Sequence, residues 1–101
     1  MVTIEEPVQN STYTEDVNST VGTAIVGSPC VIYDLTVVSD SGATGVVAFF
    51  DGTSVAGTKK MEVRVPASTT QHLCFPKGKR FTTGIFAKAN IAALDVAIDY
   101  D

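Results

Sequence analysis

The sequence lacks tryptophan and has few of the residues on which most catalytic and metal sites depend: one histidine, His72, and two cysteines, Cys30 and Cys74. It also lacks a basic excess, because 7 Lys and Arg stand against 11 Asp and Glu, which gives a net charge of −4. Nucleic-acid binding by phosphate neutralisation is therefore excluded. No run approaches the roughly 18 apolar residues of a membrane-spanning helix, so no membrane partner is expected. An apolar content of 45% argues against a disordered chain.

The 101 residues are enough for one domain, and their charge is unevenly distributed. The first twenty residues contain no Lys or Arg but carry Glu5, Glu6, Glu15 and Asp16, whereas the rest holds seven acidic and seven basic residues. We predict an extended acidic N-terminal arm over residues 1–19 and a neutral folded domain over residues 20–101. The first residues lack the apolar segment of a secretory signal, so we expect synthesis in a cytoplasm.

From residue 20 onward, short β-rich runs alternate with turn residues such as the Pro-Lys-Gly-Lys run at 76–79. The runs are 20–26, 30–38, 45–50, 60–65, 71–75, 81–88 and 94–100. Several alternate apolar and polar residues, which is typical of half-buried strands, and no segment predicts a convincing helix. We predict an all-β fold, an antiparallel β-sandwich. A jelly roll is favoured because it disposes of sheet edges in a small chain, and an immunoglobulin-like order is the alternative.

The few chemically reactive residues do not combine into a recognisable site. His72 alternates with Leu73 on a predicted strand, so it belongs on the outward face, and no nucleophile motif such as G-x-S-x-G is present. His72 and Cys74 share a face and resemble half of a metal site, but a structural zinc site needs about four ligands and only Cys30 offers a possible third. We therefore predict no catalytic residue, no metal site and no cofactor.

Two smaller features have ordinary explanations. Cys30 and Cys74 could form a disulfide, but in a protein made in a cytoplasm both are expected to be buried thiols. Two loops, 51–54 and 57–60, combine glycine with hydroxyl residues but lack the spacing and the following helix of a phosphate loop. A turn in which Asp51 accepts local backbone N–H bonds accounts for the first of them.

Two features point to partners. The strand at 45–50 is apolar on both faces, so the face that does not fill the sandwich must be covered by the arm, by a loop or by a second subunit, and we assign Val47 and Phe49 to such an interface. Lys77, Lys79 and Arg80 form a basic cluster that is either a solvated turn or a docking site for an acidic surface, such as the acidic arm of a neighbouring copy. A folded body this small is marginally stable, which also favours self-association or docking on a larger surface.

Four segments together resemble small β-sandwich proteins of tailed bacteriophages. They are GSPCVIYDL at 27–35, FFDGTS at 49–54, VPASTT at 65–70 and FPKGKRFTTGI at 75–85, and the resemblance covers about residues 20–101. It is closest in kind to head-decoration, or cement, proteins. The resemblance implies a non-enzymatic virion protein that binds the major capsid protein on the outer capsid surface, as a homotrimer, after synthesis in the host cytoplasm.

A second hypothesis of a different class is a carbohydrate-binding or receptor-binding module of a phage fibre or tail, because sandwiches often carry such sites. Glycan platforms commonly use exposed Trp or Tyr. This chain has no Trp, and its only tyrosines are Tyr13, Tyr33 and Tyr100. The sequence therefore favours the decoration protein.

Overall fold

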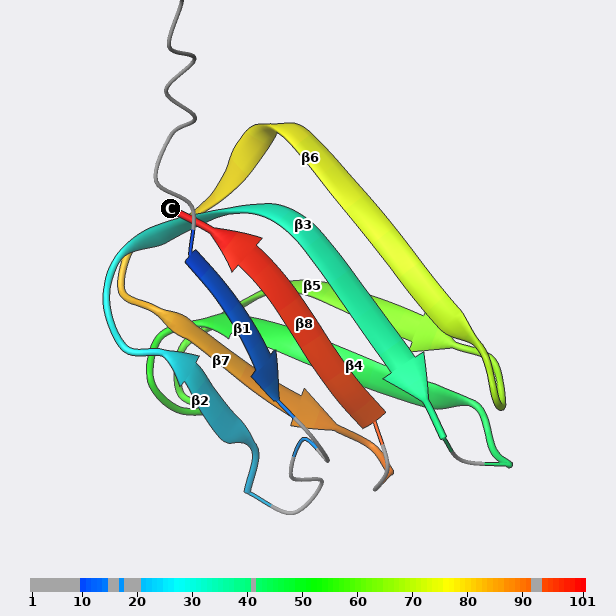
Figure 1. Ribbon diagram of the computed structural model, residues 1–101. Coiled ribbons are helices and arrows are strands. Elements are labelled where there is room, and N and C mark those ends of the chain that lie inside the picture. The colour runs from blue at the N-terminus through cyan, green and yellow to red at the C-terminus, as the bar shows by residue number, and fades with distance from the viewer. Residues whose placement is uncertain (1–9, 15–16, 18–20, 41, 92–93) are drawn as a thin grey trace, which may run out of the picture.

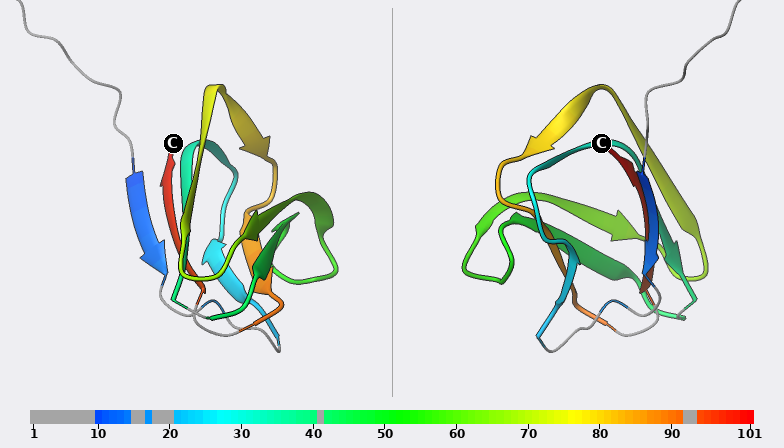
Figure 2. Two further views of the ribbon diagram at one scale, coloured as in Figure 1. Left: turned by 90° about the vertical axis from the view of Figure 1, so that its right-hand side faces the viewer. Right: turned by 60° about the vertical axis from the view of Figure 1, so that its left-hand side comes forward.

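The computed structural model describes residues 10–14, 17, 21–40, 42–91 and 94–101. Eight strands lie in these ranges: β1 (Asn10–Thr14), β2 (Thr23–Val26), β3 (Cys30–Ser39), β4 (Gly45–Asp51), β5 (Thr58–Val65), β6 (Thr70–Phe81), β7 (Ile85–Ala89) and β8 (Leu94–Tyr100). They form two antiparallel sheets packed face to face as two layers (Figures 1 and 2). We call β1-β8-β3-β6 sheet A and β2-β7-β4-β5 sheet B. No helix in the described ranges is long and apolar enough to cross a membrane.

The order of the strands identifies the topology. The first four strands pair in turn with the last four, β1 with β8, β2 with β7, β3 with β6 and β4 with β5. Additional pairings of β3 with β8 and of β4 with β7 join these pairs into two four-stranded sheets. This is a long antiparallel hairpin wrapped into two layers, which is a jelly roll. The predicted sandwich and its favoured topology are confirmed, and the immunoglobulin-like order is excluded.

The core lies between the two sheets and follows from the alternation of side chains along each strand. Val63 and Val65 of β5 point inward while Glu62 and Arg64 are exposed, as predicted. On β8, Leu94, Val96 and Ile98 are at most 1% exposed. The strand runs between the two predicted ends, Leu94 and Tyr100. The predicted alternation therefore places the core correctly on these strands.

The predicted domain boundary at residue 20 is wrong for part of the arm. Asn10–Thr14 forms β1, which pairs with β8 at the edge of sheet A. Val17 is 1% exposed, and its backbone N–H donates to the carbonyl of Leu94 at 2.8 Å. The polar composition of β1 conceals it in the sequence, because an edge strand buries little. The rest of the predicted arm, residues 1–9, 15–16 and 18–19, lies outside the described residues.

The turn predicted at 76–79 is a bend inside one long strand. Asp34 of β3 pairs with Cys74, but Ile32 pairs with Lys79, so Tyr33 alone stands opposite the four residues 75–78. The extra residues fold β6 sharply, as the top of Figure 1 shows, while both halves stay paired with β3. Gly78 has φ 77°, and a Cβ there would collide with Val31. The strand predicted at 81–88 is accordingly divided between the end of β6 and β7.

Candidate functional site

The two outward surfaces of the sandwich differ in chemistry, and the surface of sheet B is the apolar one. On β4, Val47 and Phe49 are fully buried in the core, so the prediction that these two residues form an interface is wrong. Because side chains alternate along a strand, Val46, Ala48 and Phe50 point outward instead. These inward and outward residues of β4 are all apolar. The sequence therefore indicated that the outward side of β4 is covered, but it did not show which residues lie on that side.

Neighbouring strands extend this outward surface. Phe86 of β7 pairs with Phe50, and their rings meet edge to face with centroids 6.3 Å apart. Phe86 also pairs with Ala24 of β2, and Gly22 approaches its ring so closely that a Cβ there would collide with it. We call the surface formed by Ala24, Val46, Ala48, Phe50 and Phe86 the apolar face.

Charged residues border the apolar face along β5. Lys59, Glu62 and Arg64 stand opposite Phe50, Ala48 and Val46 in the register of β4 and β5. Lys88 of β7 stands opposite Ala48 from the other side. Lys59 and Glu62 form an exposed ion pair, which leaves the border with a net positive charge.

The outward surface of sheet A is acidic. Asp95, Ala97 and Asp99 of β8 lie on the outward side of this sheet, although Asp95 is only 7% exposed, and Asp34 of β3 stands directly opposite Asp99. The β1 edge supports two of these carboxylates: the Ser11 hydroxyl donates to Asp99 Oδ1 at 2.6 Å, and the Tyr13 hydroxyl donates to Asp95 Oδ2 at 2.8 Å. We call this surface, completed by Thr36, His72 and Cys74, the acidic face.

Asp34 joins the only histidine to one of the two cysteines. Its Oδ1 lies 3.0 Å from His72 Nε2 and accepts a hydrogen bond from the Cys74 thiol at 2.9 Å. The hydrogen bond from the Cys74 thiol and, to a lesser extent, the hydrogen bond with His72 lower the pKa of Asp34 below its usual value. The hydrogen bond that the thiol donates to this carboxylate raises the pKa of Cys74, and desolvation and repulsion between the carboxylate and a thiolate act in the same direction. The thiol therefore donates to a carboxylate and not to the imidazole, which is not the arrangement of an activated nucleophile.

The two cysteines lie in different environments and both are free. His72 is exposed, as predicted, and so is Cys74, because Leu73 and Phe75 between and beyond them turn inward. The expectation of a buried thiol is therefore wrong for Cys74. The expectation holds for Cys30, which is 5% exposed. Its burial raises the pKa of the thiol. Cys30 cannot serve as the third partner of His72 and Cys74, because it is packed in the core.

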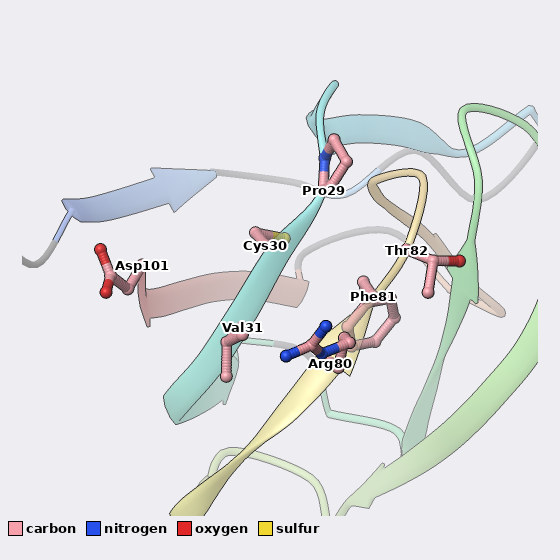
Figure 3. A pocket seen from close by; sticks show the side chains of 7 residues that line it. All are labelled: Pro29, Cys30, Val31, Arg80, Phe81, Thr82 and Asp101. Carbon is pink, nitrogen blue, oxygen red and sulfur yellow. The ribbon is translucent and has the colours of Figure 1, made fainter.

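The basic cluster lies on the bent half of β6. Lys77 and Arg80 are exposed, and Lys79 is half-buried. Arg80 borders an open hollow of about 370 Å³ between the start of β3, the end of β6 and the C-terminal Asp101. Figure 3 shows the Arg80 side chain beside Val31, with Cys30 at the start of β3 and Pro29 just before it. The proposed acidic partners of this cluster, Glu5, Glu6, Glu15 and Asp16, lie outside the described residues.

Asp51 has a structural role that its local sequence did not indicate. Its carboxylate accepts hydrogen bonds from the Thr82 backbone N–H at 2.9 Å, the Thr82 hydroxyl at 2.7 Å and the Thr83 backbone N–H at 2.8 Å. The predicted local turn bonds are thus replaced by bonds to the segment that crosses from sheet A to sheet B. These bonds, led by the Thr82 N–H, lower the pKa of Asp51 to about 2.

Comparisons with known proteins identify no family for this chain. No protein-family model matches the sequence, and a search of curated proteins gives no match. One similar solved structure is a chain from the endospore appendages of Bacillus, which are described as a novel family of disulfide-linked pili. The two chains are 16% identical with a TM-score of 0.48, over 92% of this chain and 86% of that one. A likeness of this size carries no information about function.

Proposed function

We propose that this chain is a non-enzymatic structural protein of a phage virion, a decoration protein that binds the outer surface of the capsid through the apolar face. The observation that carries the proposal is the outward row Val46, Ala48 and Phe50. An antiparallel sheet that faces water normally turns polar residues outward. Here the central strand of sheet B turns apolar residues outward, although its inward residues already fill the core.

The charges around the apolar face support docking on a specific surface. The basic border from Lys59 to Arg64 favours a partner with acidic groups, and complementary charges set orientation more than affinity. The opposite surface of the sandwich is acidic, so such a partner would be repelled from it. The sequence resemblance to decoration proteins supplies the partner: the major capsid protein of a tailed phage.

The proposal also includes a homotrimer. The apolar face is narrow, because Phe86 is only 7% exposed and the β4 residues are half-buried. Several copies acting together would multiply a weak single contact. The basic cluster Lys77, Lys79 and Arg80 remains the proposed receiver of a neighbouring copy's acidic arm. Sedimentation equilibrium should give three times the 10.6 kDa chain mass, and a monomer at all concentrations would remove this part of the proposal.

A matched pair of substitutions tests the docking surface. Ala48 and Ala97 are both half-buried outward alanines on inner strands, one on the apolar face and one on the acidic face. Ala48→Gln should weaken co-sedimentation with undecorated capsids of the parent phage by roughly tenfold or more, the effect of losing about 1.4 kcal/mol of contact. Ala97→Gln should leave it unchanged. Equal effects of the two variants, or none, would refute docking through the apolar face.

A further inference from the structure

The hydrogen-bonded group around Asp34 lies in a regular grid on the acidic face. One cross-strand row contains Cys74 of β6, Asp34 of β3 and Asp99 of β8. The next row contains His72, Thr36 and Ala97 on the same three strands. Adjacent rows on one face of a sheet bring side chains within reach of each other. The grid thus gathers side chains from three separate parts of the chain at one place.

Three atoms of this grid have the arrangement of metal ligands. Asp34 Oδ1, His72 Nε2 and Cys74 Sγ all lie within 4.8 Å of one another. Two of the separations, 3.0 Å and 2.9 Å, are hydrogen bonds. Around a tetrahedral zinc ion, ligand atoms are about 3.4–3.6 Å apart, given metal–ligand bonds of about 2.0–2.3 Å. Adjustments of about half an ångström would convert the hydrogen bonds into coordination, and these side chains are free to make them because all three reach solvent.

The surroundings of the three atoms also favour the binding of a cation. A hollow of about 180 Å³ is lined by Asp34, Thr36, His72, Ala97 and Asp99. Asp34 and Asp99 stand directly opposite each other, and like charges in that position destabilise a sheet. A bound dication would offset this repulsion. The described residues place no Lys or Arg in either row of the grid.

We propose that Asp34, His72 and Cys74 form a binding site for a divalent transition-metal ion of the zinc class on the acidic face. A set of one thiolate, one imidazole and one carboxylate suits zinc and cobalt better than magnesium or calcium, which prefer oxygen ligands alone. Three protein ligands leave a fourth position for water. On binding, the sulfur–metal bond forms as the thiol proton passes to solvent. The site does not depend on the proposed docking function, because it lies on the opposite surface.

Titration of the reduced, untagged full-length chain with Zn²⁺ by calorimetry tests the site. One ion should bind per chain. The variants Asp34→Asn, His72→Ala and Cys74→Ser should each weaken binding by roughly tenfold or more, since even indirect partners of a metal site contribute this much. Asp40→Asn is the control, because Asp40 is an exposed carboxylate outside the grid. Zinc affinity that is unchanged in all three variants, or no binding in the original chain, would overturn the proposal.

Two further measurements examine the thiol ligand in the original chain itself. Co²⁺ bound to the original chain should give the near-ultraviolet charge-transfer band of a cobalt–thiolate bond, and Cys74→Ser should abolish the band. Zn²⁺ should also slow alkylation of Cys74 in the original chain, as read by peptide mass spectrometry. A cobalt complex without the thiolate band, together with unprotected Cys74, would show that the thiol is not a ligand and would contradict the site.

Discussion

The apolar face and the acidic face belong to the same sandwich and rest on the same core, yet they differ in every property that matters for binding. The apolar face turns Val46, Ala48 and Phe50 outward beside a basic border. The acidic face turns Asp34, Asp95 and Asp99 outward and gathers His72 and Cys74 among them. The comparison shows that the inward half of the alternation specifies the fold, while the outward half is free to carry function.

The largest expected effect separates the inward from the outward half of β4. Phe49 is fully buried, so Phe49→Ala should lower the free energy of unfolding by about 3–5 kcal/mol. Phe50 is half-buried on the apolar face, and Phe50→Ala should cost only about 1 kcal/mol because less area returns to water. Urea denaturation measures both. If the two phenylalanines proved equally important to stability, the division of β4 into core and docking surface would be wrong.

The next effect concerns the edge of the acidic face. Deleting residues 1–17 removes β1, the buried Val17 and the Tyr13 hydroxyl that donates to Asp95. We expect a loss of about 2–4 kcal/mol from the lost burial and hydrogen bonds. Deleting residues 1–9 should keep stability but weaken assembly, if those residues act as the arm. Thermal melts of both truncated chains check this, and a fully stable 18–101 fragment would show that β1 is dispensable.

A smaller effect concerns the hydrogen bonds between Asp51 and the segment that crosses from sheet A to sheet B. Asp51→Ala should reduce stability by about 1.5 kcal/mol at neutral pH, because Thr82 and Thr83 lose a charged acceptor. The folded-state pKa of Asp51 is about 2, below its unfolded value, so its contribution is present above about pH 4. It should disappear as the pH falls toward 2.

Denaturation curves of the original chain and of Asp51→Ala between pH 6 and pH 2 follow this difference. The two should converge at low pH, whereas Asp40→Ala should show no comparable change, because Asp40 is exposed. A gap that stayed constant down to pH 2 would mean that the ionised carboxylate is not the stabilising group.

The smallest effect concerns the basic border. The Lys59–Glu62 ion pair is exposed, so Lys59→Ala should change stability by less than about 1 kcal/mol. Its effect should appear instead in the salt dependence of capsid binding, which should become shallower when one positive charge is removed. Binding measured at several salt concentrations decides this, and an unchanged slope would place the charged border outside the contact.

The sequence predicted the sandwich well because alternation is a local property. The strand from Leu94 to Tyr100 and the outward position of His72 both follow from it. Alternation could not decide which face of β4 points into the core. In the sequence, the pair Val47 and Phe49 is as apolar as the pair Val46 and Phe50. Alternation also missed β1, whose side chains are polar at an edge.

The group formed by Asp34, His72 and Cys74 on the acidic face could not be predicted from local sequence patterns for a different reason. His72 and Cys74 were recognised as sharing a face, but their third partner is 38 and 40 residues away in the chain. Asp34 meets Cys74 because residues 34–38 of β3 pair in continuous register with residues 70–74 of β6, next to the bend at residues 75–78. This pairing across two distant strands is not encoded in the local sequence around Asp34.

The orientation of the chain on its particle tests the central claim most directly. An electron-microscopy map of the decorated capsid should show sheet B against the shell, with Val46, Ala48 and Phe50 in the contact and the acidic face toward solvent. A map in which sheet A lies against the shell and sheet B faces outward would contradict the account.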